Sequence, residues 1–269
     1  MKRYWIFGFV LVLLAAGKFG YDYFYFDAKE RDRLVREITK PSAPIVALAQ
    51  TLELPRPVPA APTGQEVQQA LADLGIPIGE VDGKWGVRTR QALCIWRELT
   101  GRQVNRNLPI ELEQYAIVEF ARNWQGTKAN QGFKLPNGFV VGLNINRTCQ
   151  SAIWVKGKGT KEIRTMIAST GMPGFETDAG NFKVGWKVNR WYLSIIYPDG
   201  WMYRPLFFNG GQAVHGSQYD SYVHWFPASH GCVRMLGKDI DALWAGGFGN
   251  GSAVRVYGDW NPYTQDPVK

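Results

Sequence analysis

The second half of the chain has the pattern of short β-strands, which constrains its fold more than any other feature. Apolar and polar residues alternate through Val141, Leu143 and Ile145, with the period of two that is typical of a β-strand. β-branched and apolar residues, which favour strands, continue this pattern in two further runs, residues 153–155 and 162–169. The pattern therefore predicts several short strands in sequence.

Turn sequences separate these runs. Residues 156–159 read Lys-Gly-Lys-Gly and residues 198–200 read Pro-Asp-Gly, both of which favour tight turns, so hairpins are expected at each place. Between Gly138 and Asp239 there is almost no helical pattern. We therefore expect a mostly antiparallel β domain over residues 136–258, followed by a short tail, 259–269.

A helical pattern precedes the β domain. Thr63 and Glu66 have the spacing of a capping box, and Gly75 marks the end of the first helix. A glycine-rich loop over 79–86 leads to a second helix with Thr89 as its expected N-cap, and a third helix is expected over 109–122. The residues expected on the buried faces are Val67, Ala70, Leu71 and Leu74 in the first, Ala92, Leu93, Trp96 and Leu99 in the second, and Leu112, Tyr115, Ala116 and Phe120 in the third. These helices predict a small domain over residues 63–123.

The N-terminal segment, residues 1–26, has the pattern of an export signal. Lys2 and Arg3 precede an apolar run from Tyr4 to Gly17. The aromatic stretch that follows could lie at a membrane interface, so either a cleaved signal peptide or a membrane anchor fits. Residues 27–62 are expected to form a short charged helix and then a proline-rich spacer.

The three cysteines, Cys94, Cys149 and Cys232, are an odd number. In an exported protein an unpaired thiol suggests a reactive cysteine. Cys94 and Cys149 lie in apolar surroundings, so two buried free thiols are favoured over a disulfide between them, with the pairing left open.

The residues with the strongest chemical signal lie near the C-terminus. Two of the three histidines, His215 and His230, occur close to Cys232. A histidine within hydrogen-bond reach can take the proton of a thiol, so the cluster predicts acyl transfer with Cys232 as nucleophile. Gly231 would let backbone N–H groups approach a tetrahedral oxyanion. The alternatives are a buried structural cysteine and a zinc site, although the spacing is unusual for zinc and a fourth ligand is not obvious.

The stretch Gly210 to Ser217, followed by Ser229, His230, Gly231, Cys232 and Arg234, resembles the signature of the YkuD-like L,D-transpeptidase catalytic domain of bacterial cell-wall synthesis. Gly171 and residues 177–182 resemble further family landmarks, with Asp178 where proline is usual. Arg234 stands where some members carry asparagine. The resemblance implies a β-sandwich-like fold within an α+β multidomain chain.

The resemblance also implies roles. Cys232 would attack a tetrapeptide stem of peptidoglycan and release D-Ala, and His215 would be the general base, oriented by the carbonyl of Gly216. His230 and Gly231 would support the oxyanion, while Ser229 would buttress the turn. Arg234 would bind a stem carboxylate or form a structural ion pair. The thioester would then yield a 3-3 cross-link, with no metal or organic cofactor required.

Residues 68–101 resemble the small three-helix peptidoglycan-binding domain, through Asp82, Gly83, Gly86 and Thr89. Ile95-Trp96 replaces the usual Phe-Gln, so either wall binding or a spacer role fits. The connection between the two motif halves could form a lid over the substrate. Its candidate lid residues are Tyr219, Tyr222, His224, Trp225 and Phe226. At least half of them are expected to pack in the core instead, and His224 is expected at the surface.

The net charge of +8 suits an anionic cell wall and membrane, to which the N-terminal segment would attach the chain. A nucleic-acid partner is not expected, because the basic residues are scattered and no recognition motif accompanies them. The same thiol chemistry would also serve a carboxypeptidase or an amidase acting on wall-attached protein. A non-catalytic wall-binding protein is the third hypothesis, and the intact Cys232 and His215 argue against it.

Overall fold

The computed structural model describes residues 60–124, 133, 135, 137–157 and 162–259. The expected export segment 1–26, the spacer up to residue 59 and the tail from residue 260 lie outside the described residues. None of the described helices combines the length and the apolar character that crossing a membrane requires.

The first helix, α2 (Gly64–Asp73), begins and ends as its sequence predicts. The Thr63 side chain accepts a hydrogen bond from the Glu66 N–H at 3.2 Å, and the Glu66 carboxylate accepts one from the Thr63 N–H at 2.7 Å, which completes the capping box. Gly75 follows with a φ of 74°, a conformation that favours glycine. All four residues predicted for its buried face are buried.

The other two helices, α3 (Val87–Leu99) and α4 (Glu111–Arg122), correct two predictions. Thr89 is not the N-cap of α3, because the helix begins two residues earlier after Gly86, and the Thr89 hydroxyl instead bonds the Gln68 side chain at 3.0 Å. Leu112 is not on the buried face of α4, since it is 76% exposed. The buried face is rotated onto Ile117, with Phe120 and Ala121 beside it at helical spacing.

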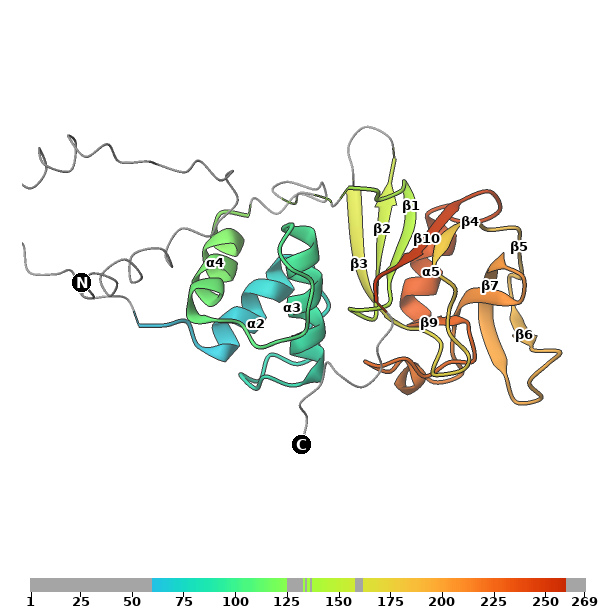
Figure 1. Cartoon of the computed structure of the whole chain (residues 1–269), viewed down its shortest axis with the longest axis horizontal. Helices are drawn as coiled ribbons and strands as arrows, with labels where there is room; N and C mark the ends of the chain where they lie inside the picture. The colour runs from blue at the N-terminus through green and yellow to red at the C-terminus, as the bar shows by residue number, and fades with distance from the viewer. Residues whose placement is uncertain (1–59, 125–132, 134, 136, 158–161, 260–269) are drawn as a thin grey trace, which may run out of the picture. The chain divides into compact units, whose positions relative to one another are not determined.

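Within the described residues, ten strands form one sheet (Figure 1). Nine of them pair in the order β4-β10-β1-β2-β3-β9-β8-β7-β5, and β6 pairs with β7 outside this order. Their bounds are β1 (Gly142–Asn146), β2 (Ser151–Lys156), β3 (Glu162–Ser169), β4 (Gly180–Lys183), β5 (Trp186–Lys187), β6 (Trp191–Leu193), β7 (Trp201–Asn209), β8 (Gln212–Gly216), β9 (Val233–Met235) and β10 (Ala253–Tyr257). Helix α5 (Gly237–Ala245) follows β9, and a 3-10 turn, η2 (Asp220–Tyr222), follows β8.

The sheet is mostly antiparallel, as expected, with parallel pairs only at β1 with β10 and β8 with β9 among the described strands. Both predicted hairpins are present, since β2 pairs antiparallel with β3 and β6 with β7. The expectation of a sandwich-like fold changes to one curled sheet. Strand β3 pairs with β2 along most of its length and with β9 at its last two residues, so it joins the two halves.

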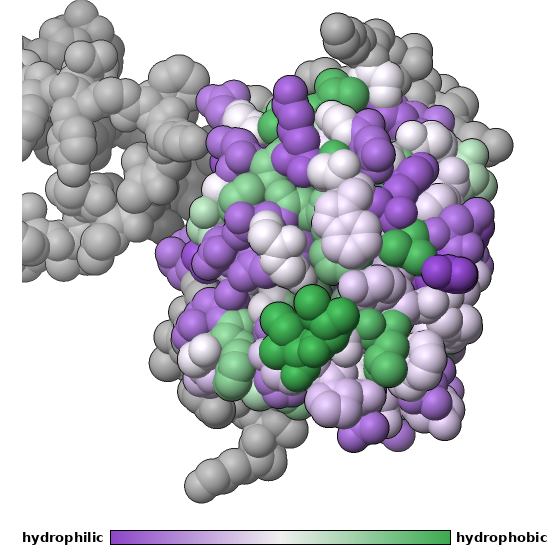
Figure 2. Space-filling model, turned by 90° about the vertical axis from the view of Figure 1, so that its right-hand side faces the viewer, coloured by the Kyte–Doolittle hydropathy of each residue, from purple (hydrophilic) through white to green (hydrophobic). Residues whose placement is uncertain are grey.

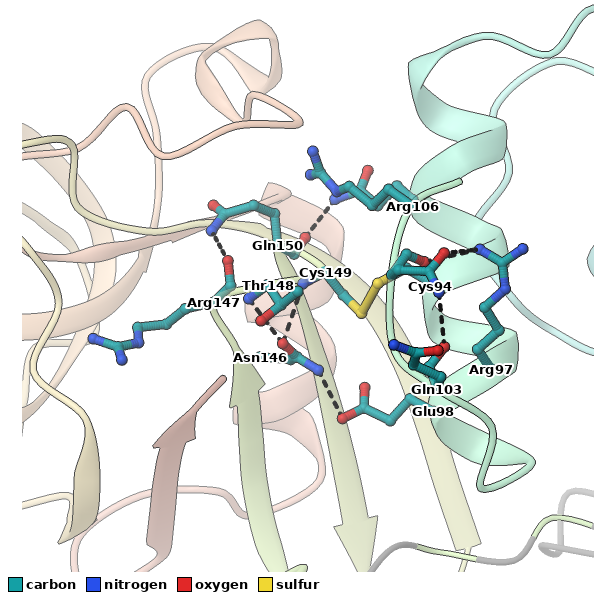
Figure 3. Close-up of a disulfide and its surroundings, with 12 residues drawn as sticks. Cys94, Arg97, Glu98, Gln103, Arg106, Asn146, Arg147, Thr148, Cys149 and Gln150 are labelled. Atoms are coloured by element: carbon teal, nitrogen blue, oxygen red, sulfur yellow. Dashed lines mark hydrogen bonds between the residues drawn. A yellow bond between two sulfur atoms is a disulfide. The ribbon is translucent and has the colours of Figure 1, made fainter. Parts of the chain in front are cut away.

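The helices and the sheet share a hydrophobic core. Ile153 and Val155 of β2 pack in the same cluster as the buried faces of α2 and α3. A disulfide between Cys94 of α3 and Cys149 joins the same two parts, with their Cα atoms 5.5 Å apart (Figure 3). The prediction of two free thiols is therefore wrong. The sequence separation of 55 residues made the pairing unpredictable, because only the fold brings α3 to the β1–β2 turn.

Candidate active site

Strands β8 and β9 bring His215 and Cys232 onto one face of the sheet. The two strands run parallel, with Val214 opposite Val233 and His215 opposite Arg234. Val214 and Val233 point into the main core. Because side chains alternate along a strand, His215 lies on the opposite face, as does Cys232, one residue before Val233. The Ala213 N–H donates to the Cys232 Sγ at 3.4 Å, which fixes the sulfur beside β8.

His215 is held in one ring orientation. Its Nδ1 lies 2.8 Å from the Gly216 carbonyl oxygen, so Nδ1 carries the hydrogen and donates, while Nε2 is left as the basic nitrogen. The side chain is buried, and this desolvation lowers the pKa of His215 to about 4, with the nearby Arg234 charge acting in the same direction. The imidazole is therefore neutral at physiological pH and can accept a proton.

Cys232 is the one cysteine in the described residues without a disulfide, and it is half-buried. Burial raises the pKa of its thiol, while the hydrogen bond from Ala213 and the charge of Arg234 oppose this effect. The resting site accordingly holds a neutral thiol and a neutral imidazole that line the same cavity. Nucleophilic attack then requires proton transfer to a base, the role that the His215 Nε2 can fill.

A network of side-chain hydrogen bonds holds the turn from Ser229 to Cys232. The Ser229 hydroxyl donates to the Cys232 carbonyl and accepts from the Gly231 N–H at 3.2 Å. Gly231 has a φ of 108°, which only glycine adopts without strain. Glycine is thus needed here for its backbone conformation, and its N–H is engaged by Ser229 rather than pointing at a substrate.

Thr177 ties this turn to the loop after β3, a role that sequence reasoning missed although the residue belongs to a family landmark. Its buried hydroxyl donates to the Gly231 carbonyl at 2.8 Å and accepts from the Gly171 N–H at 2.9 Å. A threonine within the family landmark is the available sequence signal, but it does not say which backbone groups the hydroxyl bonds.

A cavity of about 280 Å³ opens onto Cys232. Five of the seven predicted site residues line it, namely Cys232, His215, Ser229, His230 and Arg234. Gly216 contributes its carbonyl to His215 and Gly231 shapes the turn. The exposed ring of His230 contacts Phe175 at 5.0 Å and Tyr197 at 4.6 Å between ring centroids.

The β6–β7 hairpin supplies an unpredicted wall of the cavity, with Ser194, Ile196, Tyr197 and Trp201. The Pro-Asp-Gly turn predicts this hairpin, but no sequence signal places it beside Cys232. Ile195 and Ile196 at its tip are 90% and 69% exposed. Figure 2 views the molecule from the side on which β5 to β7 lie and shows an apolar patch at its surface.

Arg234 faces the cavity and donates to the Ala228 carbonyl at 3.2 Å. No carboxylate of the described residues forms an ion pair with it, so the structural ion pair considered from the sequence is not found there. A half-buried guanidinium beside a cavity can bind an anionic group of a ligand.

The connection between the motif halves does not pack as expected. None of its five aromatic residues is buried, and Tyr219 and Tyr222 are 56% and 45% exposed. The buried residues between the motif halves include Val223 and Pro227. His224 is half-buried rather than at the surface, because its ring stacks on Phe226 with centroids 4.7 Å apart. Tyr222 lines the cavity.

No group of three or more His, Cys, Asp or Glu side chains in the described part of the chain is arranged to hold a metal ion.

Comparison with known proteins identifies this domain. Residues 142–245 match the family model of the YkuD L,D-transpeptidase catalytic domain. A search of curated proteins found no match. Among solved structures, an L,D-transpeptidase from Xylanimonas cellulosilytica is 25% identical, with a TM-score of 0.48, over 75% of this chain and 99% of that one. One from Stackebrandtia nassauensis is 24% identical, with a TM-score of 0.44, over 75% and 93%. The family match covers strands β1 to β9, the residues that line the cavity and both motif halves, so a YkuD L,D-transpeptidase catalytic domain spans residues 142–245.

Proposed function

We propose that this protein is a cell-wall L,D-transpeptidase that forms 3-3 cross-links in peptidoglycan. The observation that carries the proposal is the pair Cys232 and His215, which share one sheet face and one cavity, with the His215 Nδ1 bonded to the Gly216 carbonyl at 2.8 Å. That bond leaves Nε2 as the base, and the family match of residues 142–245 supports a substrate in peptidoglycan.

In the first half-reaction the Cys232 Sγ attacks the carbonyl carbon between the third residue of a tetrapeptide stem and its terminal D-Ala. The His215 Nε2 takes the thiol proton and returns it to the amine of D-Ala as the C–N bond breaks. The product is a thioester on Cys232 with free D-Ala. In the second half-reaction an acceptor amine attacks the thioester carbonyl carbon, and His215 takes a proton from that amine. The C–S bond then breaks, and His215 passes the proton to the Cys232 sulfur, which leaves as a thiol.

Three groups would stabilise the two negative charges of the substrate. Because the Gly231 N–H bonds Ser229, we assign the oxyanion to the Cys232 N–H and the His230 side chain, at the same turn. We assign the carboxylate of the terminal D-Ala to Arg234, whose guanidinium lines the cavity and has no carboxylate partner in the described residues.

We also propose that the protein is exported and acts on the wall side of the cytoplasmic membrane, attached there by residues 1–26. The Cys94–Cys149 disulfide supports this location, since such bonds form and persist in oxidising compartments. The helical domain 63–123 is proposed to contact the wall. Fractionation of cells expressing the full chain tests the location, and sedimentation with purified sacculi tests wall binding.

The activity is tested with disaccharide-tetrapeptide muropeptides, using the protein from residue 60 onward and its Cys232→Ala variant, with mass spectrometry of the products. Dimers that have lost one D-Ala, absent with the variant, are expected. Tripeptide monomers alone would instead make the protein a carboxypeptidase, and amine adducts of a wall-attached protein would make it an amidase-type transferase. No product that depends on Cys232 would reject the enzyme assignment.

A further inference from the structure

The connection between β8 and β9, residues 217–232, is held at its carbonyl groups by side chains. Ser169 donates to the Phe226 carbonyl at 2.8 Å, and Arg234 donates to that of Ala228 at 3.2 Å. Two further donors come from the helical domain. Arg88 of α3 donates to the Val223 carbonyl at 2.6 Å, and Arg106 donates to that of Trp225. The helical domain therefore supports the segment that carries the active-site turn.

Arg88 bonds the backbone next to a residue that lines the cavity. Val223 directly follows Tyr222, which lines the cavity beside Cys232. Arg88 is also bonded to Gln91, one helical turn on, at 2.9 Å, so its guanidinium is oriented from both sides. Removing Arg88 would leave the Val223 carbonyl without this donor and would release the Tyr222 side of the cavity.

A chain of hydrogen bonds, the second route from α3, connects Gln91 with the turn that carries Cys232. Its side-chain amide donates to the carbonyl of Gln150, and the Gln150 side chain exchanges two hydrogen bonds with Thr170, both 2.8 Å long. The Thr170 carbonyl accepts from the N–H groups of Ala228 and Ser229 at 2.9 and 3.0 Å. Ser229 in turn donates to the Cys232 carbonyl.

Burial and the disulfide make this second route rigid. Gln91, Gln150 and Thr170 are each at most 1% exposed, so water does not compete for their hydrogen bonds. Gln150 directly follows Cys149, whose disulfide to Cys94 holds the same helix one turn further along (Figure 3). Gln150 also has a φ of 53°, a left-handed conformation that this environment maintains.

We propose that α3 is a positioning element of the active site, with Arg88 fixing the Tyr222 wall through Val223 and Gln91 fixing the Cys232 turn through Gln150, Thr170 and Ser229. The kinetic part of this inference rests on the proposed function. The two residues act on different steps. Arg88 shapes where the substrate binds, and Gln91 shapes where the sulfur attacks.

The test compares three substitutions with a matched control, each made in the full chain. Arg88→Ala removes both bonds, and Arg88→Lys keeps the charge and one donor. Gln91→Met keeps the length of the side chain but removes its N–H donors and the Oε1 that accepts from Arg88. Arg97→Ala is the control. Arg97 is a buried arginine of the same helix, α3, and it bonds Glu113 at 2.7 Å and the loop after α3 rather than the connection. This control measures what a loss of helix stability alone does to the kinetics and to hydrogen exchange.

Two readouts decide the outcome. In steady-state kinetics with muropeptides, Arg88→Ala should raise KM and Gln91→Met should lower kcat, each by about 10- to 100-fold, as small displacements in an active site do. Arg88→Lys should recover part of the loss. In hydrogen exchange, the amides of residues 217–232 should exchange at least about tenfold faster in Arg88→Ala and Gln91→Met than in the wild type.

Equal effects of Arg97→Ala on kinetics or on exchange in residues 217–232 would overturn the proposal, as would unchanged exchange in the other two variants. Exchange needs no substrate. If the wild-type protein makes no Cys232-dependent product, the proposed function fails, while the exchange rates still decide whether α3 holds the connection.

Discussion

Loss of the Cys94–Cys149 disulfide should destabilise the whole described fold. The bond closes a loop across 55 residues of chain. In the chain-entropy model, the unfolded state regains about 4 kcal/mol of entropy at 25 °C when a loop of this length is opened. The double variant Cys94→Ala/Cys149→Ala should therefore lose about 4 kcal/mol in its free energy of unfolding, or about 8 to 16 °C in Tm.

The assay is urea unfolding followed by tryptophan fluorescence. Trp96 is fully buried in α3 and Trp154 is buried in β2, so the two parts of the protein each hold a reporter. Because Ile153 and Val155 pack in the core of the helices, one transition is expected rather than two. Reducing the wild-type protein should reproduce the loss, while the reductant should leave the double variant unchanged.

Cys232→Ala serves as the matched control, because it removes a half-buried thiol that closes no loop. It should change the free energy of unfolding by much less. A loss of under about 1 kcal/mol in the double variant would refute the reasoning, since the model assigns a loop of this length about four times as much. Two separate transitions in the wild type would refute the shared core.

Three further predictions follow from single residues. Burial raises the pKa of Cys232, and His215, with a pKa of about 4, is neutral. The rate at which iodoacetamide alkylates Cys232 should therefore keep rising with pH beyond the ordinary thiol range. A plateau of this rate near pH 6 would indicate a preformed thiolate instead. Burial raises the pKa of Glu98 from 4.5 to about 6, so the folded protein binds this proton more tightly than the unfolded chain does, and stability is lost as pH rises through that interval. The stability of Glu98→Gln relative to wild type should thus grow by about 2 kcal/mol between pH 4 and pH 7 in urea titrations, and a constant difference would contradict this. Thr177→Val leaves the buried Gly171 N–H and the Gly231 carbonyl without their shared hydrogen-bond partner. Thermal unfolding should therefore show a free energy of unfolding lower by about 1–3 kcal/mol, a loss that Thr177→Ser largely avoids. An equal loss in both variants would show that the methyl group, not the hydroxyl, matters.

Local patterns predicted the elements of this fold well. The capping box of α2, the turn sequences of both hairpins and the period of two in β1 depend on residues that are close together in the chain, so the sequence carries their signal directly. The motif residues His215 and Cys232 were predicted to meet, and the parallel pairing of β8 with β9 places them on one face.

Contacts between distant segments were not predictable in the same way. The disulfide depends on α3 lying against the β1–β2 turn, and the wall of the cavity depends on where the β6–β7 hairpin lies. The buried face of α4 was misplaced for a related reason, since Leu112 and Ile117 are both apolar and only packing against the other helices selects Ile117. Alternation and spacing say which residues prefer burial, but not which partner buries them.

The most direct test of the central claim is to observe the acyl-enzyme. The protein is mixed with a tetrapeptide stem, quenched in acid within seconds and analysed as an intact protein and then as peptides. A mass increase equal to the stem without its terminal D-Ala, located on Cys232 and absent from Cys232→Ala, is the predicted result. An adduct on another residue, or release of D-Ala that persists in Cys232→Ala, would contradict the assignment of Cys232 as the nucleophile.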